Sequence, residues 1–374
     1  MTRMCLEPIY KVKLADVCEI LDNKRIPITA SDRKTGIYPY YGANGVQDYV
    51  DGYIFDEDLV LLAEDGGNFG SKDKPIAYRV SGKCWVNNHA HVLRPLKNID
   101  VDYLCYSLMF YDVNKLVNGA TRKKLNKSEM LKMEVPLLEL EEQRQIVKKI
   151  KRLENIIESR KKQVDLLDLL IKSRFIEMFG DIVLNDKHHG QYILNDVCVK
   201  ITDGTHDTPK RIENGYLFLT GKNIRANGII YDEIEYVSKE VHKEIYKRCN
   251  PEYGDVLYTN IGVNYGTACL NNRTDEFSMK NIALLKPNKK ILNSYYLWYC
   301  LNLMRDFILE KNQAGGAQTF MGLATIKNIK IQVPSIELQN QFASFVQQVD
   351  KSKFTHCYEL LLLIIKKIWY NNYV

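Results

Sequence analysis

The sequence lacks the features that assign a chain to several common classes of protein. Its nine cysteines are scattered, and none belongs to a Cys-x-x-Cys motif, which argues against a zinc ribbon and against a disulfide framework. The longest apolar run, residues 360–365, is far shorter than the roughly 20 residues that cross a bilayer. The first residues contain no apolar segment of the kind found in signal peptides. We therefore expect a cytoplasmic protein.

Sequence motifs for catalysis are also missing. There is no Walker A loop and no glycine-rich turn that would bind a nucleotide. Asp-x-Lys occurs at Asp22 and Asp32, as chance allows in a lysine-rich chain, and no Glu-x-Lys supports a nuclease site. The stretch Asn250-Pro251-Glu252-Tyr253 resembles the Asn-Pro-Pro-Tyr loop of amino-methyltransferases, but Glu252 replaces the second proline. We interpret the chain as non-catalytic, without a metal site.

What the sequence does contain is ordinary globular composition with a small positive excess. Hydrophobic residues make up 45% of the 374 residues, which excludes wholesale disorder and predicts two or three domains. The 52 Lys and Arg exceed the 46 Asp and Glu, for a net charge of +6. This excess suits a polyanionic partner but does not identify one.

The strongest pattern is an internal duplication, because several short words recur in the same order. One such word may recur by chance, whereas an ordered set predicts two copies of one unit. The final words place Val135 and Val333, and then Gln143 and Gln341, 198 positions apart. The matched words are Leu14-Ala15-Asp16-Val17-Cys18 with Leu194-Asn195-Asp196-Val197-Cys198, Asp58-Leu59-Val60-Leu61 with Asp255-Val256-Leu257-Tyr258, Val92-Leu93-Arg94-Pro95 with Leu284-Leu285-Lys286-Pro287, and Val135-Pro136 with Val333-Pro334.

Each copy reads as a β-rich part followed by a long helix. Alternating apolar runs separated by Gly and Asn turns predict strands, and a heptad-like seam predicts a helix from Glu139 to Met178. We expect an α+β chain of two pseudo-symmetric β-rich domains separated by two long antiparallel helices that form a coiled coil. The expected boundaries are 1–134, 135–180, 181–332 and 333–374. The seam consists of Ile146, Ile150, Leu153, Ile157, Arg160, Val164, Leu167, Ile171, Arg174 and Met178.

Such an arrangement suits a reader of duplex DNA. Successive major-groove approaches on one face lie ~34 Å apart, and a 40-residue helix is roughly 60 Å long. Two divergent domains on such a spacer would read two different half-sites.

The chain resembles, over essentially its whole length, the DNA-specificity subunit of type I restriction-modification systems. The resemblance is carried by the duplicated words, with residues 38–45 and 62–66 in the first domain and residues 202–206 and 219–224 in the second. The junction at 119–123 and the stretch 135–143 resemble the start of the family's conserved helical region.

The resemblance implies recognition of a bipartite, asymmetric target in double-stranded DNA. It also implies assembly with two modification (methyltransferase) subunits and recruitment of restriction/translocase subunits. S-adenosylmethionine, ATP and Mg are then expected on those partners, and no cofactor on this chain. The alternative from another class is a helical scaffold that binds protein and has no DNA role.

Candidate DNA contacts lie in Gly- and Asn-rich loops and in basic clusters, because Lys and Arg bind phosphates and Asn can pair with adenine. Most tyrosines in such a chain pack in the core, and many such loops are only turns. The loops are therefore better candidates than their individual members, and His206 is expected to be a hydrogen-bonding residue. The candidates are Tyr40, Tyr41, Asn44, Asn68, Lys72, Lys74, Arg122, Lys123 and Lys124 in the first copy, and Thr205, His206, Thr208, Lys210, Lys222, Asn223, Asn260, Asn264 and Tyr265 in the second.

Overall fold

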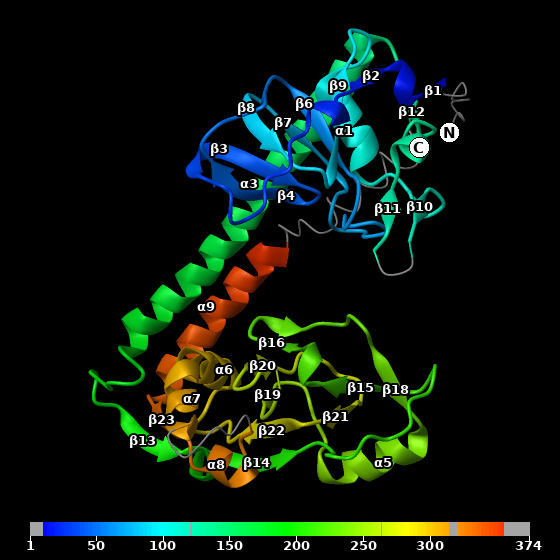
Figure 1. The fold of residues 1–374 in the computed structure, drawn as a ribbon. Helices are drawn as coiled ribbons and strands as arrows, with labels where there is room; N and C mark the ends of the chain where they lie inside the picture. The colour runs from blue at the N-terminus through cyan, green and yellow to red at the C-terminus, as the bar shows by residue number, and fades with distance from the viewer. Residues whose placement is uncertain (1–9, 120–121, 263, 314–319, 355–374) are drawn as a thin grey trace, which may run out of the picture. The chain divides into compact units, whose positions relative to one another are not determined.

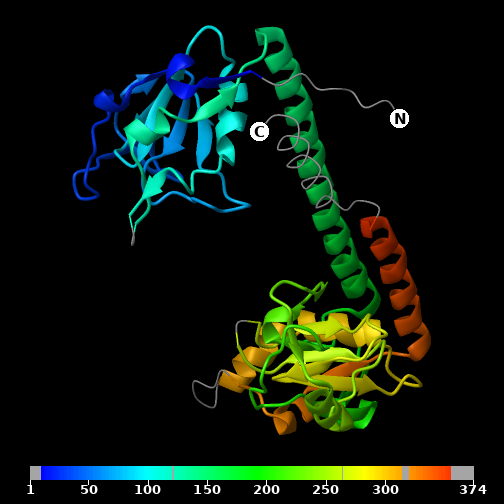
Figure 2. The same ribbon diagram turned by 90° about the vertical axis from the view of Figure 1, so that its right-hand side faces the viewer.

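A computed structural model describes residues 10–119, 122–262, 264–313 and 320–354 (Figures 1 and 2). The described part of the chain divides into two compact units, the first comprising residues 10–161 and the second residues 162–354, apart from the gaps given above. Both units combine helices and strands, which confirms the α+β class. In the described part of the chain, no helix is long and apolar enough to cross a membrane.

The first unit is built on an antiparallel sheet in the order β2-β9-β6-β7. Helix α1 (Val101–Met109) packs on β6 and β7 (Figure 1), and the Asp100 carboxylate caps its first turn by accepting from the backbone N–H of Asp102 and Tyr103. Every side chain of β6 is buried, because the sheet is covered on both faces. The strands are β2 Cys18–Ile20, β9 Ala90–Pro95, β6 Leu59–Ala63 and β7 Ala77–Val80.

A second sheet, in the order β4-β3-β8-β5, and smaller elements complete the first unit. The β3–β4 hairpin turns at Gly45, whose φ of +109° favours glycine. These elements are β3 Thr35–Gly42, β4 Gly45–Val50, β5 Phe55–Asp56, β8 Lys83–Val86, the pairs β1 Lys11–Lys13 with β12 Glu134–Pro136 and β10 Val117–Asn118 with β11 Lys124–Leu125, the short helices η1 Leu14–Asp16 and η2 Asp22–Lys24, and α2 Lys127–Met130.

The second unit repeats the main sheet as β14-β22-β19-β20, with α6 (Ser294–Leu303) against β20. A further sheet, β18-β15-β21, contains the parallel pair β15–β21. The strands are β13 Gly190–Ile193, β14 Cys198–Asp203, β15 Tyr216–Thr220, β16 Ile224–Arg225, β17 Gly228–Ile229, β18 Glu235–Val237, β19 Val256–Thr259, β20 Ala268–Leu270, β21 Ser278–Lys280, β22 Ile282–Pro287 and β23 Lys330–Val333. The remaining helices are α4 Leu194–Val197, η3 Gly221–Asn223, α5 Lys239–Arg248, α7 Arg305–Gln313, α8 Leu323–Lys327 and α9 Ile336–Phe354.

The main sheets of the two copies are equivalent strand by strand, but strand pairing corrects part of the predicted alignment. Val60 pairs with Leu93 and Val256 with Leu285, so Val60 is equivalent to Val256 and the predicted match at Asp58 and Asp255 is wrong by one residue. A one-residue error exchanges the two faces of a strand. In the closing pairs, Val12 faces Val135 and Tyr192 faces Ile331. The equivalent residues of β6 and β19, and those of β12 and β23, therefore differ in number by 196, whereas Leu93 and Leu285 on β9 and β22 differ by 192.

Two buried glutamines support the corrected alignment. Gln143 donates to the carbonyl oxygens of Asn98 and Leu138 and accepts from the backbone N–H of Asp100. Gln339 makes the same three contacts, with Ile291, Pro334 and Asn293. Both side chains are fully buried. Gln339, rather than the predicted Gln341, is thus the partner of Gln143 in the duplication.

Helix α3 (Leu140–Phe179) begins in the first unit and ends in the second. The predicted helix from Glu139 to Met178 is confirmed, and every position of its predicted seam is buried or half-buried. Within the second unit α3 packs antiparallel on α9 (Figure 2), because Phe175 contacts Phe342, Arg174 lies over Phe345, and Lys353 forms an ion pair with Asp168. The predicted continuation of the second helix beyond Phe354, including 360–365, lies outside the described residues.

Candidate DNA interface

Three loops of the first unit meet at the end of β6. The Asn44 side chain, at the β3–β4 turn, donates to the Gly66 carbonyl at 3.0 Å. The segment at 124–125 adds to the end of β6, where Asp65 and Lys124 form an antiparallel bridge and the Leu125 N–H donates to the Glu64 carbonyl. Three of the sequence-predicted groups, the turn at Asn44, the loop at 66–74 and the basic cluster, therefore lie together.

Two adjacent carboxylates hold these loops. Glu64 accepts from Arg25 at 2.6 Å and pairs with Lys124 at 3.0 Å. Asp65 accepts from Arg122 at 2.7 Å, and its oxygen lies 2.7 Å from Nδ1 of His89. Burial raises the pKa of Glu64, but hydrogen bonds from Arg25 and Lys124 outweigh it, and the net pKa is lowered.

Behind this pair lies a buried group of Asp22, Glu64 and His91, whose possible ligand atoms are within 4.8 Å of one another. Nε2 of His91 carries a hydrogen because it faces the Leu125 carbonyl at 2.8 Å, which can only accept. Its Nδ1 lies 2.7 Å from Asp22. Because Arg25 and Lys124 already occupy the Glu64 oxygens, these residues do not fit a metal ion and act as a structural ion-pair network.

In the second unit a different set of loops meets at the edge of the β18-β15-β21 sheet. Lys280 lies between Thr220 on β15 and Thr205, with which it forms a parallel bridge. The Lys280 ammonium group donates to the Thr208 hydroxyl. His206 projects beside this edge, with Nε2 2.8 Å from the Asp203 carboxylate and Nδ1 3.0 Å from the Asn281 side chain. The loop at 203–210 is therefore fixed to the turn at 279–281.

The loop at 260–265 reaches the same region. The Asn264 side chain donates to the Gly221 carbonyl at 2.8 Å, which joins this loop to the end of β15. Lys222, on that end, is exposed and lies 4.0 Å from Glu233. Thr205, the turn at 221–223 and Asn264 thus lie near the same end of the β15–β21 pair, at Thr220 and Lys280.

Four predicted contacts are corrected because their side chains are buried. Tyr40 is 1% exposed, and its hydroxyl bonds to the backbone of Ile28. Asn223 caps the turn after Thr220, Tyr265 is 8% exposed, and the Asn260 side chain is wholly enclosed. These four side chains belong to the interior of the unit and not to a surface that DNA can approach. The other candidates are exposed or half-buried, and they are Tyr41, Asn44, Asn68, Lys72, Lys74, Arg122, Lys123, Lys124, Thr205, His206, Thr208, Lys210, Lys222 and Asn264.

The structure also adds residues that sequence reasoning missed. Asp65 and His89 in the first unit, and Arg248 and Lys280 in the second, support the candidate loops directly. Arg248 donates to the Gly204 carbonyl and pairs with Asp203 at 3.5 Å. No local motif marks these residues, because each partner is distant in sequence.

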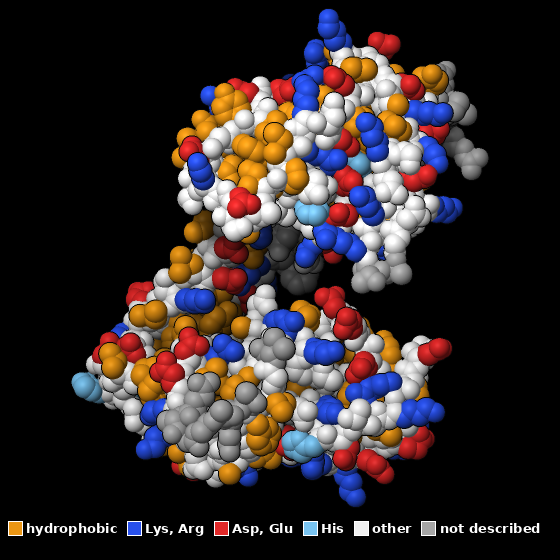
Figure 3. Space-filling view, in the orientation of Figure 1, with side chains coloured by type: hydrophobic (Ala, Val, Ile, Leu, Met, Phe, Trp, Pro, Cys, Tyr) orange, Lys and Arg blue, Asp and Glu red, His pale blue; other side chains and the backbone are white. Residues whose placement is uncertain are grey.

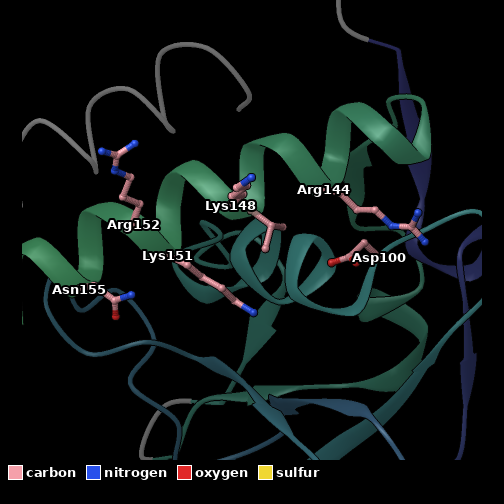
Figure 4. Close-up of a pocket in the computed structure, with 7 residues that line it drawn as sticks. Asp100, Arg144, Lys148, Lys151, Arg152 and Asn155 are labelled. Carbon is pink, nitrogen blue, oxygen red and sulfur yellow. The ribbon is translucent and has the colours of Figure 1, made fainter.

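Positive and negative side chains are mixed on the face that Figure 3 shows. Figure 3 shows Lys and Arg side chains on both units, interspersed with Asp and Glu. A separate basic face lies on α3 in the first unit, around a hollow of about 450 Å³ (Figure 4). Arg144, Lys148, Lys151 and Arg152 project from this helix, and Lys151 pairs with Asp102 at 2.7 Å. This face is on the scaffold helix rather than on the loops.

Comparison with known proteins identifies the family to which both units are similar. Residues 7–168 and 189–357 match the family model of the type I restriction modification DNA specificity domain. A putative type I restriction enzyme specificity subunit of Haemophilus influenzae is 26% identical over 347 residues, which cover 90% of this chain and 86% of that protein.

Two solved structures have a similar fold. The S subunit of a type I restriction-modification system from M. genitalium matches with a TM-score of 0.62 and 13% identity, over 100% of this chain and 98% of that one. A chain from a study of the assembly and conformational transition of the type I R-M system matches with a TM-score of 0.53 and 18% identity, over 97% of both chains. Since the family match includes most of both units, the protein belongs to the type I restriction-modification DNA specificity family and recognises specific DNA sequences.

Proposed function

We propose that the chain is the non-catalytic specificity subunit of a type I complex and that its two units read the two unlike halves of a bipartite target. The observation that carries this proposal is the duplication, in which one scaffold recurs with the same sheet order but with different loops at the strand ends. Divergent loops on equivalent scaffolds favour an asymmetric target over a palindrome. On this proposal, residues 1–134 and 181–332 read DNA, and the helical segments 135–180 and 333–374 separate them.

The proposed readers are the exposed loops already described. In the first unit they are the turn at Asn44 and the loop at 66–74, and in the second they are the loops at 203–210 and 221–223. Glycines let the backbone approach the bases, and the Asn, Thr and His side chains can bond to base edges. Lysines such as Lys74, Lys210 and Lys222 would bind phosphates and supply affinity without sequence choice.

The reactions belong, on this proposal, to partner subunits. Two modification subunits would methylate the target with S-adenosylmethionine, and restriction subunits would use ATP and Mg. An unusually apolar exposed row on α3 supports the presence of partners, because such a row on a helix is costly to leave in water. Its members are Leu166, Leu169, Leu170 and Ile176, each between 47% and 63% exposed.

Methylation mapping of a host genome, with and without this gene, tests the proposed function. The expected result is loss of one methylated motif, with two unlike halves and a fixed gap, when only this gene is deleted. An unchanged methylome would contradict the proposal and would favour a helical scaffold without a DNA role. Methylation by the purified chain alone, given S-adenosylmethionine, would contradict the non-catalytic assignment.

A further inference from the structure

The basic cluster at 122–124 contains three cations with unequal surroundings. Arg122 donates to Asp65 at 2.7 Å, and Lys124 pairs with Glu64 at 3.0 Å. Lys123, between them, is exposed and forms no ion pair with any described residue. Sequence reasoning treats all three as equal phosphate contacts, whereas their partners separate them into two kinds.

The carboxylates that hold Arg122 and Lys124 are themselves largely enclosed. The Asp65 side chain is 17% exposed and the Glu64 side chain 12% exposed, whereas Arg122 and Lys124 are 60% and 46% exposed. If Arg122 turned to a phosphate, Asp65 would keep only its contact with His89. Removing a charged partner from a largely enclosed carboxylate costs more free energy than an exposed ion pair with a phosphate gains. Arg122 and Lys124 are therefore more stable on Asp65 and Glu64 than on a DNA phosphate.

The Arg122 guanidinium also lies close to the first residue of the loop at 66–74. Gly66 has a φ of +60°, and a Cβ atom on it would lie 2.9 Å from a terminal nitrogen of Arg122. The Asn44 side chain donates to the carbonyl of the same residue at 3.0 Å. Gly66 is therefore held by the Asn44 hydrogen bond and lies close to the Arg122 guanidinium, at the first position of the loop that leads to Asn68 and Lys74.

From these contacts we propose that Arg122 and Lys124 are positioning residues, which fix the first DNA-reading loop by holding Asp65 and Glu64. Lys123 is then the member of the cluster that contacts DNA phosphate. This assignment rests on the proposed function, because it presupposes that the loop at 66–74 reads the first half-site.

Salt dependence separates the two roles. Each phosphate contact contributes about 0.9 to the slope of log K against log salt concentration. The experiment uses the full chain in its complex, a duplex that carries the mapped target, and duplexes altered in one half only. Binding is measured over a series of salt concentrations for the wild type and for Lys123→Ala, Arg122→Ala and Asp65→Asn.

Lys123→Ala is expected to lower the slope by about 0.9 and to keep the discrimination between target and altered duplexes. Arg122→Ala and Asp65→Asn are expected to leave the slope unchanged and to reduce discrimination at the first half-site about tenfold, within the range of a lost base contact. The double variant should lose no more discrimination than either single one, because both changes break the same pair.

Discrimination at the second half-site is the internal control, because a misfolded or unassembled complex would lose both halves together. If Arg122→Ala lowers the slope by about one and keeps first-half discrimination, Arg122 is a phosphate contact and the inference is wrong. Unchanged first-half discrimination in Asp65→Asn would overturn it equally. A wild-type complex that shows no preference for its target would instead contradict the proposed function.

Discussion

The residues that follow β6 and β19 occupy equivalent places in the two units, but the first has an acidic side chain and the second a neutral amide. Glu64 follows β6 and is paired with Arg25 and Lys124, in a network that includes Asp22 and His91. Asn260 follows β19, is wholly enclosed, and has no hydrogen-bond partner for either side-chain amide atom in the described structure. The scaffold is thus kept while the strand ends differ, which is the pattern expected where two copies read different sequences.

The largest expected effect comes from breaking the charged network in the first unit. Glu64→Gln removes a charge that faces the Arg25 guanidinium, which is 12% exposed, and should lower the free energy of unfolding by about 3 kcal/mol. Asp58→Asn is a matched control, because Asp58 is half exposed in its pair with Arg79 and should cost less than about 1 kcal/mol. Urea unfolding of the assembled complex provides the measurement, and equal losses in the two variants would refute the buried-network interpretation.

The shared scaffold gives the next effect. Gln143→Leu and Gln339→Leu each leave three backbone groups without their partner, so each should cost about 2 kcal/mol in its own unit. Hydrogen exchange that resolves the two units should show the loss near α1 in one variant and near α6 in the other. Gln145→Leu is the control, since Gln145 is exposed and its side chain bonds, among the described residues, to Glu141 alone. A loss confined to one of the two variants would show that the glutamines are not equivalent.

The comparison also predicts different responses to acid. Burial raises the pKa of Asp22 and of Glu64, but hydrogen bonds from His91 to Asp22, and from Arg25 and Lys124 to Glu64, leave both pKa values lowered. A lowered pKa in the folded state means that the stabilisation is complete above the unfolded value, about 4, and is lost as the pH falls through the folded value. Asn260 does not titrate. As the pH is lowered below about 4, hydrogen-exchange protection at β6 should therefore be lost before protection at β19. Simultaneous loss of protection at both strands would count against this interpretation.

The smallest effect is expected at Asn260. Because its buried amide has no partner, Asn260→Leu should be neutral or should stabilise the chain by up to about 1 kcal/mol. Thermal unfolding of the complex measures this change. A destabilisation above about 1 kcal/mol would mean that the amide makes contacts important for folding.

The duplication, the fold class and the seam of α3 could be predicted from the sequence, because they depend on apolar patterns that repeat over short stretches of the chain. Sequence reasoning matched Gln143 with Gln341 because the Val-Pro word recurs two positions late in the second copy. Only strand pairing and the contacts of Gln339 correct the alignment. The charged contacts were inaccessible for a different reason. Arg122 and Asp65 are 57 residues apart, and nothing in either local sequence indicates that they meet.

The most direct test of two independent readers is an exchange of residues 1–134 for the equivalent part of a relative with a different target, followed by methylation mapping. We expect one half of the methylated motif to change while the other half and the gap are kept. A motif changed in both halves, or in neither, would contradict it.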